Sequence, residues 1–358
     1  MDNIYQKLNE FFNLFCIYYN YPLYMDHISE YLSLSVLASR MISMDFSQGK
    51  IAETVPVAEQ SLPLNESLDL CNKFVEKYLS TYYDTWKEYL SNGVIDFTDS
   101  EQIILDGNMP QGSKTVTFNK DNGLFREIDV DLKHDYSDPA TIIHEFLHQL
   151  NMSDTQDGNE TVSRTLFTEV VSIYFETLMY RFMENQGYSR QEIAKVQFRR
   201  VQDFYKSLVQ SNDELMMLRD YHIFGKISDD NFEKTRKLGL LHFDTKETYQ
   251  MVARDFNDRI VAEGENIDIY LNCKLDIFKS LRYVIGTSLA YWAISQNDSN
   301  MPWKMLMFNE DLAEDRDLGY AFSRFSLNPG DMHAIVSGTE KELIRCSKNL
   351  NYSSKKKK

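Results

Sequence analysis

The sequence predicts a mainly α-helical protein made of many helices, with one small β element. Glycine and proline are scarce, at 14 and 7 of 358 residues, so few positions interrupt a helix. Apolar residues recur at three- and four-residue spacing over long stretches, which is typical of amphipathic helices. Only residues 114–132 have the pattern of a β-hairpin. With 43% hydrophobic residues, the chain can bury a sizeable core.

The first part of the chain is expected to be helical. Residues 4–48 fit two helices, and residues 49–63 break the pattern as a connector. A single long helix is predicted over residues 67–93, opened by capping residues near Ser67 and stopped near Gly93.

The hairpin comprises strands at 114–118 and 124–132, joined by the turn 119–123. The Asn-Gly pair in this turn tolerates the positive φ that a tight hairpin requires. Asp138, followed by proline, then opens a helix, and the pattern is helical again from residue 163 onward.

Charge and length limit the classes of partner. The net charge is −16, from 38 basic and 54 acidic residues, which disfavours nucleic acids and anionic membranes as partners. No apolar run approaches the roughly 18 residues of a membrane span. The first residues have neither the basic region nor the cleavage site of a signal peptide. A last basic segment, residues 351–358, is expected to be disordered.

The cysteines indicate a compartment. Cys16, Cys71, Cys273 and Cys346 are far apart in the chain and form no CxxC pair. They are typical of reduced thiols, so we expect a cytoplasmic protein. The sequence leaves the oligomeric state open.

The stretch TIIHEFLHQLN, residues 141–151, carries the chemistry. On a helix, His144 and His148 are four residues apart and project from the same face. Their imidazoles can hold one tetrahedral zinc ion, and Glu145 can then take a proton from a metal-bound water. The surrounding positions are apolar, and burying two histidines without partners would be costly. The alternative is a chance match among the seven histidines of the chain.

A third ligand is expected on the next helical stretch, residues 165–183. Glu169 and Glu176 are seven positions apart and share one face of an otherwise apolar pattern. Buried carboxylates require a cation or hydrogen-bond donors. We therefore expect Glu169 to bind the metal and Glu176 to orient a histidine from behind. The alternative is a solvated stripe that carries both carboxylates.

Four stretches resemble the oligoendopeptidase F and thimet oligopeptidase group, the M3 metallopeptidases. Residues 67–96 are similar to the long helix before the active site of that group, and residues 126–150 to its edge strand and zinc helix. Residues 167–179 resemble the segment that supplies the third zinc ligand. Residues 281–293 resemble, more weakly, the helix that contributes transition-state tyrosines.

The resemblance implies a gluzincin-type catalytic domain with a small β-sheet beside the active-site helix. It would span residues 61–350, preceded by a helical segment at 1–60. The implied activity is a zinc-dependent metalloendopeptidase acting on oligopeptides, with Tyr283 stabilising the oxyanion. The edge of the strand 124–132 could hold an extended peptide.

The chain also departs from that group. Leu147 stands where its motif has glycine, and Asn151 where it has a last histidine. Cys273 and Leu281 lie about where further histidine or tyrosine side chains are expected, so only Tyr283 matches. His222 or His242 could substitute, although each can equally be an ordinary surface or packing histidine. The chain is shorter than typical members and is expected to lack most of their N-terminal lobe.

These departures leave two alternatives open. One is a non-catalytic module of the same fold, in which the cleft binds a peptide or protein. The other is a different zinc-peptidase family that uses the same two histidines and a distant glutamate.

Overall fold

The structure is a computed structural model with a mainly helical fold and a small three-stranded mixed sheet. This confirms the predicted fold class at that level. It describes residues 60–99, 112–120, 123–151, 162–201, 276–313 and 332–351, with isolated positions at 203, 204, 207, 246, 247, 249–251, 253, 254 and 323. The expected N-terminal segment and basic tail lie outside these residues, apart from their innermost positions.

Two helices replace the single long helix predicted over residues 67–93. Helix α4 spans Leu64–Tyr78 and α5 spans Tyr83–Ser91, with the short 3₁₀ helix η3, Ser80–Tyr82, between them. The helix ends because Leu79 adopts φ −127° and ψ 33° while its side chain is completely buried. The start also differs from the prediction, because Pro63 precedes the first turn and Ser67 lies inside the helix.

The break allows α5 to place two aromatic rings against the helix of residues 138–151. Trp86 and Tyr89 contact Phe146 edge-on, with ring centroids 5.2 Å and 5.9 Å apart. Such aromatic pairs contribute beyond the area they bury. The turn at Leu79 therefore allows Trp86 and Tyr89 to pack in the core against Phe146.

The sheet contains the predicted hairpin and a third strand that the sequence did not reveal. Strands β2 (Lys114–Lys120) and β3 (Gly123–Leu132) pair antiparallel, and β1 (Ile95–Asp99) pairs parallel to β3. The order is β1-β3-β2, so β3 is the middle strand. The peptide-binding edge expected on the strand 124–132 is therefore wrong, because β3 pairs with a strand on each side and the outer strands are β1 and β2.

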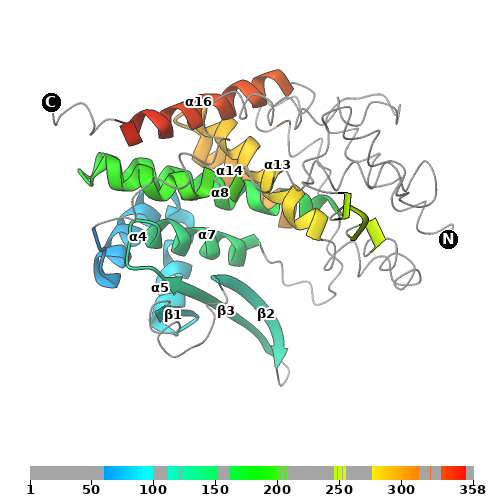
Figure 1. The fold of residues 1–358 in the computed structure, drawn as a ribbon. Coiled ribbons are helices and arrows are strands. Elements are labelled where there is room, and N and C mark those ends of the chain that lie inside the picture. The colour runs from blue at the N-terminus through cyan, green and yellow to red at the C-terminus, as the bar shows by residue number, and fades with distance from the viewer. Residues whose placement is uncertain are drawn as a thin grey trace.

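Two helices carry the motif residues. Helix α7 spans Asp138–Asn151, and α8 spans Val162–Asn185. At the start of α7, the carboxylate of Asp138 accepts a hydrogen bond of 3.0 Å from the backbone N–H of Lys133. Figure 1 shows α7 between the sheet and α8, with α13 (Asp276–Ser295) and α16 (Met332–Asn351) beyond α8.

Helix α8 is the centre of the described fold. It contacts α7 on one side and α13 and α14 (Met301–Ala313) on the others. Most of its described side chains are buried as a result, so a buried charged side chain there requires a partner. Among the described residues, no helix is long and apolar enough to cross a membrane.

Candidate metal centre

Three side chains from α7 and α8 meet at one point. The ligand atoms of His144, His148 and Glu169 all lie within 4.8 Å of one another. The Nε2 atoms of the two histidines are 2.9 Å apart, and Oε2 of Glu169 lies 3.4 Å from each of them. Two adjacent helices thus bring together the three residues that the sequence singled out.

These distances suit a single small cation. Zinc bonds of 2.0–2.1 Å at tetrahedral angles place neighbouring donor atoms about 3.3 Å apart. Glu169 is 1% exposed, and its Oε2 has no hydrogen-bond partner among the described residues. A buried carboxylate oxygen that has only two imidazole nitrogens nearby, at 3.4 Å, is stabilised when those rings are protonated or when a cation sits between the three groups. The donor set therefore fits zinc, with no fourth protein ligand among these residues.

The tautomer of His144 also suits a metal. Its Nδ1 lies 3.0 Å from Oε2 of Glu176, and a carboxylate only accepts hydrogen bonds. Nδ1 therefore carries the proton, and in the neutral ring the Nε2 lone pair faces His148 and Glu169. The hydroxyl of Ser172 lies 3.3 Å from Nδ1 of His148 and can orient that ring.

The acidic surroundings favour positive charge at this point. Burial alone would lower the pKa of His144, but the carboxylates of Glu169 and Glu176 outweigh it and raise the pKa from 6.5 to about 10. Burial would raise the pKa of Glu169, yet His148 and His144 hold it well below its ordinary value. The two carboxylates therefore favour a proton or a metal ion at the imidazoles.

Glu176 has a second cationic partner that sequence reasoning missed. Its Oε1 lies 2.7 Å from Nε of Arg200, on the helix of residues 190–201. Burial would raise the pKa of Glu176, but Arg200 and His144 lower it. Glu176 therefore stays anionic, within hydrogen-bond distance of both His144 and Arg200.

Glu145 is buried next to the donor cluster and receives a hydrogen bond from the sheet. The hydroxyl of Thr115, on β2, lies 2.9 Å from Oε2 of Glu145 and 3.0 Å from its backbone oxygen. Sequence reasoning missed this contact, because 30 residues separate the two. Thr115 links the outer strand to the candidate base.

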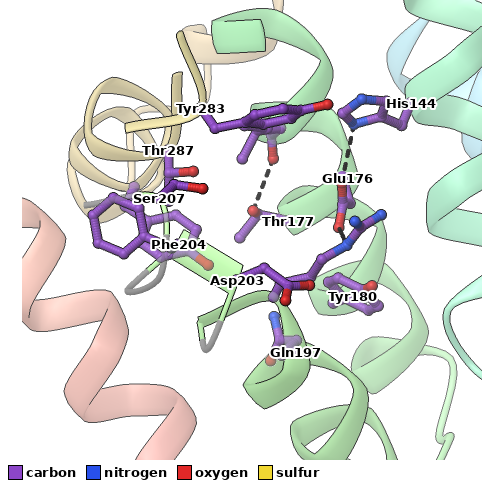
Figure 2. Close-up of a pocket in the computed structure, with 13 residues that line it drawn as sticks. His144, Glu176, Thr177, Tyr180, Gln197, Asp203, Phe204, Ser207, Tyr283 and Thr287 are labelled. Carbon is purple, nitrogen blue, oxygen red and sulfur yellow. Dashed lines mark hydrogen bonds and ion pairs between the residues drawn. The ribbon is translucent and has the colours of Figure 1, made fainter. Parts of the chain in front are cut away.

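A cavity of about 220 Å³ opens beside His144. Figure 2 shows the hydroxyl of Tyr283 pointing towards His144. The negative charge of Glu169, and then burial, raise the pKa of Tyr283 to about 12. The other residues lining the cavity are Ile173, Glu176, Thr177, Tyr180, Gln197, Arg200, Asp203, Phe204, Ser207, Thr287 and Tyr291.

Other positions singled out in the sequence contribute less or lie elsewhere. Leu147 is completely buried in the core. The two substitute histidines, His222 and His242, lie outside the described residues, as does Cys273. Arg282, which sequence reasoning missed, contacts both Glu169 and the ring of Tyr283.

Comparison with known proteins gives one structural likeness. No protein-family profile matches the chain, and no curated protein sequence matches it. The fold resembles the crystal structure of a protein from Chlamydophila abortus described as a "putative peptidase", with a TM-score of 0.53 and 13% identity. The match covers 98% of this chain but 56% of the other, so this chain spans just over half of that protein. At this identity the likeness shows the fold, and the buried His-His-Glu group is an independent observation.

Proposed function

We propose that this protein is a zinc-dependent metalloendopeptidase that hydrolyses peptide bonds in oligopeptides. The observation that carries the proposal is the convergence of His144, His148 and Glu169 on one point, with Glu145 beside them. Three protein donors plus an open position are typical of catalytic rather than structural zinc sites. The fold similarity and the resemblance to the oligoendopeptidase F group point in the same direction.

Glu145 performs the proton transfers in this proposal. Zinc, when bound, polarises the scissile carbonyl and lowers the pKa of a water ligand to about 7. Glu145 accepts the proton of the attacking water at one carboxylate oxygen and later delivers it to the leaving amine. Thr115 keeps the other oxygen engaged and so fixes the orientation of the carboxylate.

Tyr283 is the candidate donor to the developing oxyanion. Its raised pKa of about 12 keeps the phenol protonated at neutral pH, so it can donate a hydrogen bond. Its hydroxyl points towards His144 from α13. This position supports a role at the reacting carbonyl.

Strand β2 offers a place for an extended peptide. It is one of the two outer strands of the sheet, and its Thr115 contacts Glu145 directly. Backbone pairing along such an edge would hold a peptide in register beside the base. We further propose that the substrates are cytoplasmic oligopeptides rather than nucleic acids or membranes.

A non-catalytic module is the second candidate. One observation favours it: Nε of Arg282 lies 3.3 Å from Oε1 of Glu169, so the protein supplies a cation of its own to that carboxylate. In such a module Arg282 would balance the charge of Glu169 without zinc, and the cleft would bind a peptide without cleaving it.

A digest separates the two candidates. Purified protein is analysed for zinc and incubated with a peptide library, with and without a chelator. Glu145→Gln should keep zinc and lose cleavage, whereas His148→Ala should lose zinc. Glu88→Gln, an exposed glutamate of α5, is the control that should change neither. Zinc-free protein that binds peptides without turnover would favour the module, and full activity in Glu145→Gln would remove the base assignment.

A further inference from the structure

Helix α13 touches the third metal donor at a glycine. A Cβ added to Gly286 would lie 2.6 Å from Cβ of Glu169 and 3.1 Å from its carbonyl carbon. Real Cβ atoms essentially never make contacts below 3.0 Å, and the two atoms of Glu169 belong to the backbone and to the root of a buried side chain. No side chain rotation can relieve such a clash. The two helices therefore approach this closely only because residue 286 has no side chain.

One turn earlier, the same face of α13 carries a cation. Nε of Arg282 lies 3.3 Å from Oε1 of Glu169, and its guanidinium lies 5.2 Å from the ring centroid of Tyr283. Positions 282 and 286 are four apart and share a helix face. The two oxygens of Glu169 thus have different surroundings. Oε1 faces Arg282, whereas Oε2 faces the imidazoles.

We propose that Arg282 and Gly286 are positioning residues that make Glu169 a one-oxygen metal donor. Gly286 sets the distance between α13 and α8, and Arg282 retains Oε1 so that Oε2 alone is offered to the ion. This inference rests on the proposed metal centre and goes beyond it, because it assigns the support of the third donor to a separate helix.

The arrangement has a chemical consequence. A carboxylate that binds through both oxygens takes up two coordination positions and crowds the open one. By holding Oε1, Arg282 keeps a position available for water and substrate. Its positive charge also repels a nearby divalent cation, so Arg282 contributes by orienting Glu169 and not by raising the affinity for the metal.

The first test measures zinc affinity by competition with a chromophoric chelator. Gly286→Ala should weaken zinc binding about 10–100-fold, the usual effect of losing support behind a ligand. Gly338→Ala is the matched control. A Cβ at Gly338 would lie 2.7 Å from Cα of Trp292, an equally tight contact between α16 and α13 that does not touch Glu169.

The two glycine variants should therefore differ in zinc affinity while both lose some thermal stability. Equal zinc affinity in Gly286→Ala and the wild type would overturn the role of Gly286. So would an equal loss in both glycine variants, because the effect would then be one of general packing.

The second test reads coordination directly and does not depend on the glycine variants folding. In the cobalt-substituted protein, Arg282→Met should shift the visible spectrum from a four-coordinate towards a five-coordinate pattern as Oε1 joins the ion. Arg282→Lys, which keeps a cation, should retain more of the wild-type spectrum. Identical spectra in the wild type and Arg282→Met would overturn the role of Arg282.

The outcomes distinguish this inference from the proposed function. A wild-type protein that binds no zinc or cobalt defeats the metallopeptidase proposal and this inference together. Normal metal binding and cleavage in the wild type, with unchanged affinity and spectra in the variants, removes only the positioning role of α13.

Discussion

Nδ1 of His144 and Oε2 of Glu176 lie 3.0 Å apart in the interior, and this contact fixes which nitrogen of His144 faces the metal site. The other oxygen of this carboxylate, Oε1, forms an ion pair with Nε of Arg200 at 2.7 Å. A chain of contacts therefore runs from the candidate metal site through the imidazole of His144 and the carboxylate of Glu176 to the guanidinium of Arg200. A hydrogen-bonded carboxylate behind a ligating histidine fixes its tautomer and raises its basicity.

Glu176→Gln should weaken zinc binding about 10–100-fold, because the amide accepts the proton of Nδ1 without the negative charge. Chelator competition measures this change. Glu184→Gln, on the same helix, is the control, since it loses an ion pair with Arg345 remote from the site. Unchanged affinity in Glu176→Gln would mean that the contact is only structural.

The sequence revealed the parts of the site that local spacing encodes. The four-residue interval between His144 and His148, and the shared face of Glu169 and Glu176, are properties of a single helix, so they can be derived before any fold is known. Spacing along the chain does not say that α7 and α8 lie side by side, and the structure shows that they do and that the donors meet.

The supporting residues could not be predicted because tertiary packing alone brings them close. Thr115 is on a strand 30 residues before Glu145. Arg200 and Arg282 approach the carboxylates from other helices. A periodic pattern identifies buried faces, but it does not say which helix covers them.

Two features of the fold were missed in the sequence for similar reasons. The apolar spacing continues across Leu79, so the break between α4 and α5 left no mark on the periodicity. Strand β1 is short and pairs parallel to β3 across a long connection, which is a contact without a turn signature.

Thr115→Val should lower kcat about tenfold with little change in zinc content. A hydrogen bond to a charged group contributes about 1.5 kcal/mol or more, which is about a factor of ten in rate. Steady-state kinetics on a cleaved peptide measure the effect. Thr115→Ser keeps the hydroxyl and should restore most of the activity. A serine variant as slow as the valine variant would argue against the hydrogen bond as the cause.

Tyr283→Phe should lower kcat about 10²–10³-fold and leave KM nearly unchanged, as expected for the loss of one oxyanion donor. Tyr291→Phe is a suitable control, because Tyr291 lines the same cavity two turns further along α13. The assignment of Tyr283 fails if both variants lose activity equally, or if only KM rises.

Metal-free protein should lose stability as pH rises, through the titration of His144. Its pKa in the folded protein is about 10, against an ordinary 6.5, because Glu169 and Glu176 hold its proton more strongly than burial expels it. The folded state therefore binds this proton more tightly than the unfolded state does. The stabilisation is fully present below pH 6.5 and is lost as pH rises through about 10.

Urea denaturation of chelator-treated protein at pH 6, 8 and 10 would measure this loss. His144→Gln should flatten the pH dependence of the free energy of unfolding over that range. Zinc should reverse the trend, because its histidine ligands must be deprotonated and its affinity grows with pH. A metal-free protein that is equally stable at pH 6 and pH 10 would show that His144 does not take up a proton from the two carboxylates in the absence of metal.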